Sequence, residues 1–129
     1  MTKNILVYIA AFIFFAVGSS SGRPQTEATT GLGLVGSCQI SLRSTEDKSY
    51  HENTFEAWRD GYCTGIVQGV SNASPHVCPD AEVTVAQEKR VLLKYLQDHP
   101  EELHLENAVL IERALSKAFP CKDDSARAK

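Results

Sequence analysis

The sequence lacks the features that mark nucleic-acid-binding proteins and several large enzyme classes. Its formal net charge is −3, so no basic face for a nucleic acid is indicated. It contains no glycine-rich phosphate loop, no Gly-x-Ser-x-Gly and no His-Glu-x-x-His. No segment alternates cleanly between apolar and polar residues, as a half-buried strand does. These absences favour an all-α protein that binds a partner over one that catalyses a reaction.

One long apolar run is present, at the N-terminus. Lys3 precedes the apolar residues 5–17, and glycine and serine fill 18–22, which is the order of a secretory signal peptide. The run is shorter than the ~20 residues that cross a bilayer core, so a retained membrane anchor is the less favoured alternative. We predict a cleaved signal peptide over residues 1–22 and no stable membrane anchor after cleavage. A disordered leader over 23–31 is expected to follow.

Four cysteines remain in the exported chain: Cys38, Cys63, Cys78 and Cys121. An even number of cysteines in an exported chain of this size predicts two disulfides, with three possible connectivities. A metal site is disfavoured, because no two cysteines have the C-x-x-C spacing.

A central helix is predicted from about residue 54 to about 71–74, where Pro75 disfavours its continuation. Its apolar residues recur at steps of three and four, which places Trp58 and Tyr62 on a face expected to lie in the core. Thr54 is the expected N-cap. Three glycines, each costing a helix interior roughly 1 kcal/mol relative to alanine, form a neighbouring stripe that is expected to pack closely against another helix. The apolar face is Phe55, Trp58, Tyr62, Ile66 and Val70, and the stripe is Gly61, Gly65 and Gly69.

Three further helices are predicted, within an all-α bundle of four or five helices over residues 32–121. The first has an apolar face between Leu32 and Leu42, and residues 43–53 are expected to form a loop. The third follows a capping box at Thr84 and Gln87 and ends at Asp98. The fourth is expected to start at Pro100, in its first turn, and to end before Pro120. Residues 122–129 are expected to form a flexible tail.

The helix order favours one disulfide pairing. A tight turn at Pro100 makes the third and fourth helices antiparallel, which brings Cys78 near Cys121 and leaves Cys38 to pair with Cys63 across the first two helices. The alternative, Cys38 with Cys121 and Cys63 with Cys78, stays open at this stage.

The candidate chemical groups favour structural roles. Glu101 and Glu102 suit the positive end of a helix, and His99 and His104 are expected to face solvent. Cys63 lacks a histidine partner in the sequence, and a bridged cysteine is no nucleophile. We therefore assign no catalytic, metal or cofactor-binding residue, and predict that the chain is not an enzyme.

Four motifs, in order, resemble the Rap1a/Tai family of type VI secretion immunity proteins. The first is the segment 62–70, with its aromatic-Cys-x-Gly-x-x-x-Gly-Val pattern. The second is Cys78-Pro79 followed by Val83-Thr84 and Gln87. The others are Tyr95-Leu96-Gln97-Asp98-His99-Pro100 and Ala114-Leu115 with Ala118-Phe119-Pro120-Cys121. The resemblance covers about residues 35–121.

The resemblance implies a periplasmic, all-helical protein, often dimeric, that binds a peptidoglycan amidase effector and occludes its catalytic cleft. The first candidate for the inhibitory element is the hairpin tip, with its partner-binding residues Asp98, His99, Pro100, Glu101 and Glu102. The loop 74–82 is the second candidate. The alternative function is a general periplasmic stress or chaperone-like protein on the same scaffold, with no dedicated effector.

Overall fold

The computed structural model describes residues 29–122, and within them the chain is helical. No β-strand occurs between residues 29 and 122, where the only extended pairings are the isolated bridges Thr30–Glu106 and Val77–Pro120. The predicted all-α fold with two disulfides is confirmed. The elements in chain order are α2 (Gly31–Glu46), α3 (Thr54–Ala73), α4 (Val85–Asp98), the 3₁₀ turn η2 (Pro100–Glu102) and α5 (Asn107–Ala118).

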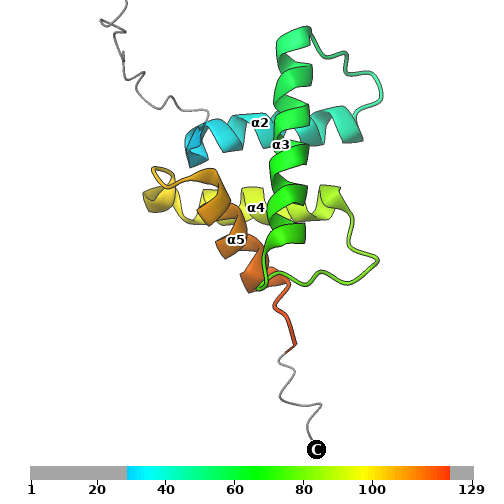
Figure 1. The fold of residues 1–129 in the computed structure, drawn as a ribbon. Helices are drawn as coiled ribbons and strands as arrows, with labels where there is room; N and C mark the ends of the chain where they lie inside the picture. The colour runs from blue at the N-terminus through cyan, green and yellow to red at the C-terminus, as the bar shows by residue number, and fades with distance from the viewer. Residues whose placement is uncertain (1–28, 123–129) are drawn as a thin grey trace, which may run out of the picture.

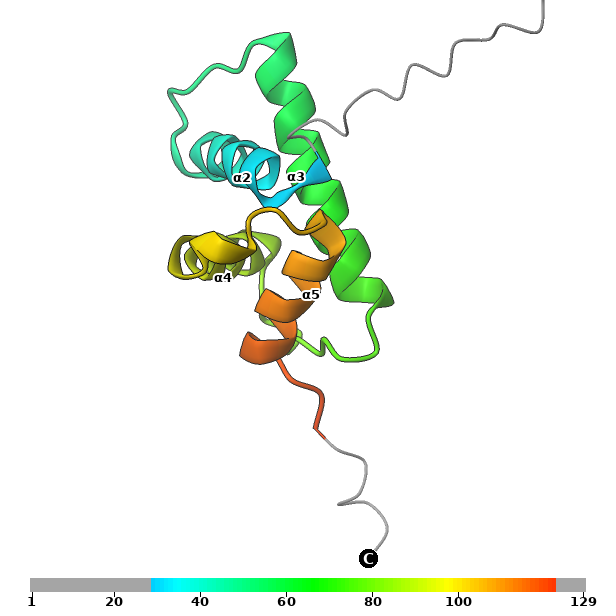
Figure 2. The same cartoon turned by 90° about the vertical axis from the view of Figure 1, so that its left-hand side faces the viewer.

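The longest helix, α3, crosses α2 and α4 steeply, and α5 completes the group on the side of α3 where α4 lies (Figures 1 and 2). The apolar core fills the space enclosed by all four helices. The largest of its fully buried side chains are Leu34, Val67, Leu92, Leu96, Leu110, Ile111 and Leu115.

The N-terminal boundary of the domain differs from its prediction. The segment 23–31 was expected to be disordered, but Thr30 pairs with Glu106 and Gly31 opens α2. A Cβ atom on Gly31 would lie 2.8 Å from Leu110 Cδ1 and 2.9 Å from Leu103 Cα, so only glycine fits there without movement of its neighbours. The predicted signal peptide and nearly all of the predicted tail lie outside the described residues.

The capping residues explain where two helices begin. Asn53, and not the predicted Thr54, is the N-cap of α3, because its side chain accepts from the backbone N–H of Glu56 while Glu56 accepts from the backbone N–H of Asn53. The predicted capping box at Thr84 and Gln87 is confirmed. The first helix extends to Glu46, four residues into the predicted loop.

The fourth helix begins later than predicted. Pro100 opens only the single turn η2, and α5 starts at Asn107. The reason is packing. Leu103 and Leu105 are partly buried against the core, and the chain must turn between η2 and α5 to bring both of them there. The predicted end before Pro120 is confirmed, since α5 stops at Ala118.

Both favoured disulfides are present, which excludes the alternative pairing. Cys38–Cys63 joins α2 to α3, with Cα atoms 5.2 Å apart. Cys78–Cys121 joins the α3–α4 loop to the residues after α5, with Cα atoms 4.8 Å apart. The second bridge is reinforced by the backbone, because Cys78 N–H donates to Phe119 O at 2.9 Å.

Candidate functional site

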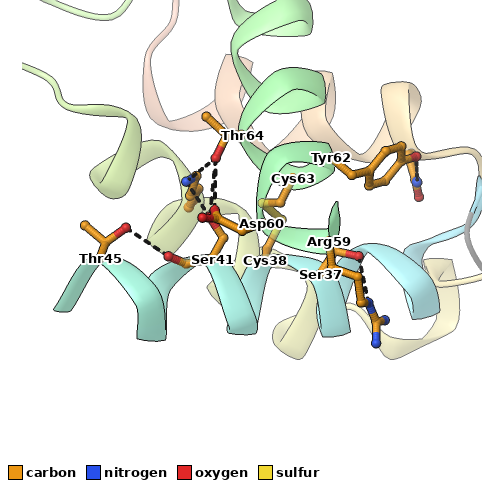
Figure 3. Close-up of a disulfide and its surroundings, with 11 residues drawn as sticks. Ser37, Cys38, Ser41, Thr45, Arg59, Asp60, Tyr62, Cys63 and Thr64 are labelled. Carbon is orange, nitrogen blue, oxygen red and sulfur yellow. Dashed lines mark hydrogen bonds between the residues drawn. A yellow bond between two sulfur atoms is a disulfide. The ribbon is translucent and has the colours of Figure 1, made fainter. Parts of the chain in front are cut away.

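The inward face of α3 is occupied by a disulfide and a polar network, shown in Figure 3. Cys63 is fully buried and bonded to Cys38 of α2. One turn away, Asp60 accepts hydrogen bonds from the hydroxyl groups of Ser41 and Thr64. Beside them, Arg59 Nε donates to Ser37 Oγ at 3.3 Å. These contacts hold α3 against α2.

Lys89 of α4 completes the network. Its side chain is only 4% exposed, and its Nζ donates to Ser41 Oγ at 2.6 Å and to Thr64 Oγ1 at 2.7 Å. Burial lowers the pKa of Lys89, while the nearby charge of Asp60 acts in the opposite direction. A lysine beside a serine is also an arrangement found in hydrolytic sites, but Ser41 is fully buried and no substrate reaches it. The network therefore joins three helices and has no catalytic access.

The outward face of α3 carries the glycine stripe and is bare. Gly61, Gly65 and Gly69 are exposed, and a Cβ atom built on any of them would meet nothing within 4 Å. The prediction that another helix packs closely against this stripe is therefore wrong for the described part of the chain. The helices α2, α4 and α5 all lie on the other sides of α3 (Figures 1 and 2).

The aromatic residues of α3 also lie largely outside the core, contrary to prediction. Phe55 is 63% exposed and Trp58 55% exposed, and only Tyr62 is partly buried. The three rings stack in a row, with centroids 6.1 Å apart for the first pair and 5.7 Å for the second. Tyr62 OH accepts from Asn107 Nδ2 at 2.8 Å. We call Phe55, Trp58, Gly61, Gly65 and Gly69 the outward face of α3.

The predicted hairpin tip projects from the end of α4 and is internally braced. Tyr95 OH donates to Glu102 at 2.8 Å, and Arg113 forms an ion pair with Glu102 at 3.1 Å. The hydrogen bond from Tyr95 holds the pKa of Glu102 below its ordinary value, and Arg113 acts in the same direction. The ring of His99 packs on Tyr95, with centroids 4.3 Å apart.

The five predicted partner-binding residues therefore differ in what they present to solvent. Asp98 is paired with Lys94 at 2.7 Å, which lowers the pKa of Asp98. Glu102 is bonded to Tyr95 and Arg113. His99 lies 3.3 Å from Glu101, whose side chain remains 67% exposed. His104 contacts the backbone carbonyl of Glu101 at 2.9 Å. The tip thus presents a carboxylate, Glu101, on a fixed support.

The second predicted element, the loop after α3, is held at both ends. Ser74 donates to Glu112 of α5 at 2.7 Å, and Cys78 is bridged to Cys121. A shallow groove lies between this loop and the end of α5, lined by Cys78, Pro79, Asp80, Ala118, Phe119, Pro120 and Lys122. Asp80 and Glu82 are exposed on the loop.

Residues 29–122 contain no group of three or more side chains suited to hold a metal ion. Among the same residues, no helix has the length and apolar character needed to cross a membrane. The tip, the loop 74–82 and the outward face of α3 all carry exposed side chains.

A comparison with protein families identifies the scaffold. The profile of the Rap1a immunity proteins matches residues 30–121, which is more than half of the chain. The chain belongs to this family. No curated protein and no solved structure matches it. A Rap1a immunity protein acts by binding a partner effector protein, so the exposed elements of this Rap1a chain are its candidate contacts.

The sequence analysis did not predict the polar network or the outward face, although the sequence contains an indication of each. Cys63 must face its disulfide partner, and Val67 and Asp60 lie within about 60° of it on a helix of 3.6 residues per turn. Trp58 is about 140° away and Tyr62 about 100°, so the cysteine, and not the aromatic spacing, marked the buried side. Lys89 stands beside the core residues Leu92 and Leu93 in the α4 pattern.

Proposed function

We propose that this chain is a periplasmic immunity protein that neutralises a peptidoglycan amidase effector of a type VI secretion system by occluding its active-site cleft. The observation that carries this proposal is the family match over residues 30–121. The signal-like N-terminus and the two disulfides are consistent with export to an oxidising compartment such as the periplasm.

The tip is the element that we assign to the cleft. An inhibitor loses less conformational entropy on binding when its inserted element is rigid beforehand. The Tyr95–Glu102–Arg113 contacts and the packing of His99 on Tyr95 supply that rigidity, and they leave Glu101 free to meet a histidine or a basic rim at the amidase site.

The experiment is co-purification of the chain with a type VI amidase effector, followed by an assay of muropeptide cleavage. We expect stoichiometric binding and loss of cleavage. Glu101→Arg should weaken inhibition at least tenfold, because it reverses the charge of the most exposed carboxylate of the tip. Glu82→Arg makes the same charge change in the loop and serves as the matched control. If Glu82→Arg abolishes inhibition and Glu101→Arg does not, the loop is the inhibitory element.

The alternative, a general stress or chaperone-like protein, draws on one observation: the exposed Phe55 and Trp58 could hold unfolded chains. It predicts that the chain suppresses aggregation of unrelated denatured proteins and binds no amidase. An aggregation assay with Trp58→Ala beside the wild type separates the two functions.

A further inference from the structure

The two disulfides differ in their access to solvent. Cys38 and Cys63 are both fully buried between α2 and α3. Cys78 is exposed on the loop after α3, and its partner Cys121 is half-buried. A thiolate breaks a disulfide by attacking one of its sulfur atoms, so the rate of this reaction depends on access to the sulfur. In the folded chain, the Cys78–Cys121 bridge is therefore open to attack and the Cys38–Cys63 bridge is shielded.

The exposed bridge fastens two short segments that make few other contacts. These are residues 78–83 of the loop and residues 119–122 after α5, and neither contains a buried residue. Of their side chains, Phe119 packs partly against the core. The backbone adds the hydrogen bond from Cys78 N–H to Phe119 O at 2.9 Å. Segments with few buried apolar contacts and exposed backbone bonds are the ones that open locally.

The helical core is held by other contacts. The buried bridge joins α2 to α3, and Lys89 joins α4 to both of them. The helix α5 contributes the fully buried side chains Leu110, Ile111 and Leu115. Opening the exposed bridge removes none of these contacts from the folded chain. It does release a constraint on the unfolded chain, so the free energy of unfolding falls while the core keeps its packing.

The exposed bridge also determines the shape of a surface. The shallow groove between the loop and the end of α5 has Cys78, Pro79 and Asp80 on one wall and Phe119 and Pro120 on the other. These walls belong to the two segments that the bridge joins. The groove is therefore retained only while the bridge is closed.

We propose that the Cys78–Cys121 disulfide is a redox-sensitive clasp, which a dithiol reductant opens in the folded chain, releasing residues 78–83 and 119–122 from each other while the helical core is retained. One thiolate of the reductant attacks Cys78 Sγ, the more exposed sulfur, and Cys121 leaves as a thiolate that takes up a proton. The second thiol of the reductant then displaces Cys78 from the mixed disulfide. Each cysteine thereby gains one electron and one proton, and the reductant leaves as its own disulfide.

The clasp makes the shape of the loop depend on an oxidising compartment. The loop 74–82 is the second candidate contact with an effector, so the oxidised chain presents this contact in a fixed shape and the reduced chain does not. This consequence rests on the proposed function, whereas the opening of the clasp does not.

Differential thiol labelling tests the opening of the clasp. The oxidised chain is treated with dithiothreitol for graded times without denaturant and quenched with an alkylating reagent, and the labelled cysteines are quantified by mass spectrometry. We expect Cys78 and Cys121 to be labelled about tenfold faster or more than Cys38 and Cys63. The matched control is the same chain in concentrated guanidinium chloride, where both bridges are accessible and should open at nearly equal rates. Equal rates in the folded chain, faster opening of the buried bridge, or no opening without denaturant would overturn the proposal.

Amide hydrogen exchange tests what the clasp holds. After selective reduction, exchange at the Cys78 amide should accelerate about tenfold or more, because its N–H donates across the clasp to Phe119 O, whereas amides within α3 and α4 should keep their protection. The double substitution Cys78→Ser with Cys121→Ser should reproduce the reduced chain and keep the helical circular dichroism of the wild type.

Two outcomes of the exchange measurement contradict the clasp. Unchanged exchange at Cys78 would mean that the bridge does not hold the loop, and loss of protection throughout α3 and α4 would mean that it supports the whole fold. No effector takes part in the labelling or exchange measurements. Their failure is therefore distinguishable from failure of the proposed immunity function.

Discussion

The two long sides of α3 show how differently one helix can be used. The inward side holds Cys63, Val67 and Ser71, all buried, together with the network around Asp60. The outward side holds two exposed aromatic rings and three glycines, with nothing of the described chain against the glycines.

The two sides of α3 therefore serve different purposes: the inward side stabilises the fold, and the outward side is left exposed for recognition. Bonds that fix α3 to α2 and α4 lie on the inward side: a disulfide, a hydroxyl–carboxylate pair and a buried ammonium group. Substitutions there should change the free energy of unfolding. Substitutions on the outward side should leave that free energy nearly unchanged.

The largest effect is expected from removing the Cys38–Cys63 bridge. On the loop-entropy account, a bridge that closes 25 residues contributes about 3.5 kcal/mol. The double substitution Cys38→Ala with Cys63→Ala should lower the free energy of unfolding by about this amount, measured by urea denaturation at micromolar or lower protein concentration. Both sulfur atoms are buried, so lost packing adds to the effect. A change below about 1 kcal/mol would contradict an inward face that depends on this bridge.

Lys89→Met is expected to have the next largest effect. It removes the ammonium that donates to the Ser41 and Thr64 hydroxyls and balances the charge of the Asp60 carboxylate, and hydrogen bonds to charged groups contribute about 1.5–3 kcal/mol. We expect a loss of about 2 kcal/mol in denaturant unfolding. Adding Asp60→Asn should recover part of it, since the uncompensated charge is then gone. Independent, additive losses would show that the two charges are not coupled.

The same lysine gives a pH dependence with a defined sign. Because burial lowers the pKa of Lys89 in the folded chain, the unfolded chain binds this proton more tightly. The free energy of unfolding should therefore rise as pH increases towards 10.5, the ordinary pKa of lysine. The slope of stability against pH in this range should be smaller for Lys89→Met than for the wild type.

Alanine at two glycines should shift stability in opposite directions. Gly31→Ala places a methyl group 2.8 Å from Leu110 Cδ1 and should cost about 1–3 kcal/mol, as overpacking does. Gly65→Ala enters open space and should stabilise the monomer by about 0.5–1 kcal/mol through helix propensity. Thermal unfolding at submicromolar concentration gives both values. Destabilisation by Gly65→Ala in the monomer would mean that the stripe is packed within the chain after all.

Some features of this structure could be predicted from the sequence and others could not. The helix ends at Ala73 and Asp98, the capping box at Thr84 and both disulfides were predictable, because each depends on local chemistry or on helix order. The exposure of Trp58 did not follow from the spacing of apolar residues, which defines a stripe but not what covers it; the position of Cys63 on the helix was the better guide to the buried side. The later start of α5 depended on the packing of Leu103 and Leu105, which is a tertiary effect.

The smallest change in stability is expected at the residue that a sequence pattern would place deepest in the core. A buried tryptophan typically costs 3–5 kcal/mol when it is truncated to alanine. Trp58 is 55% exposed, and its main contacts are the neighbouring rings of its own helix. Trp58→Ala should therefore change the monomer's free energy of unfolding by about 0.5 kcal/mol or less in urea denaturation. Val67→Ala, on the inward side of the same helix, is the control and should cost at least about 1–2 kcal/mol, because its side chain is fully buried. If the two costs were equal, both sides of α3 would contribute alike to the stability of the fold, and the contrast between them would lose its basis.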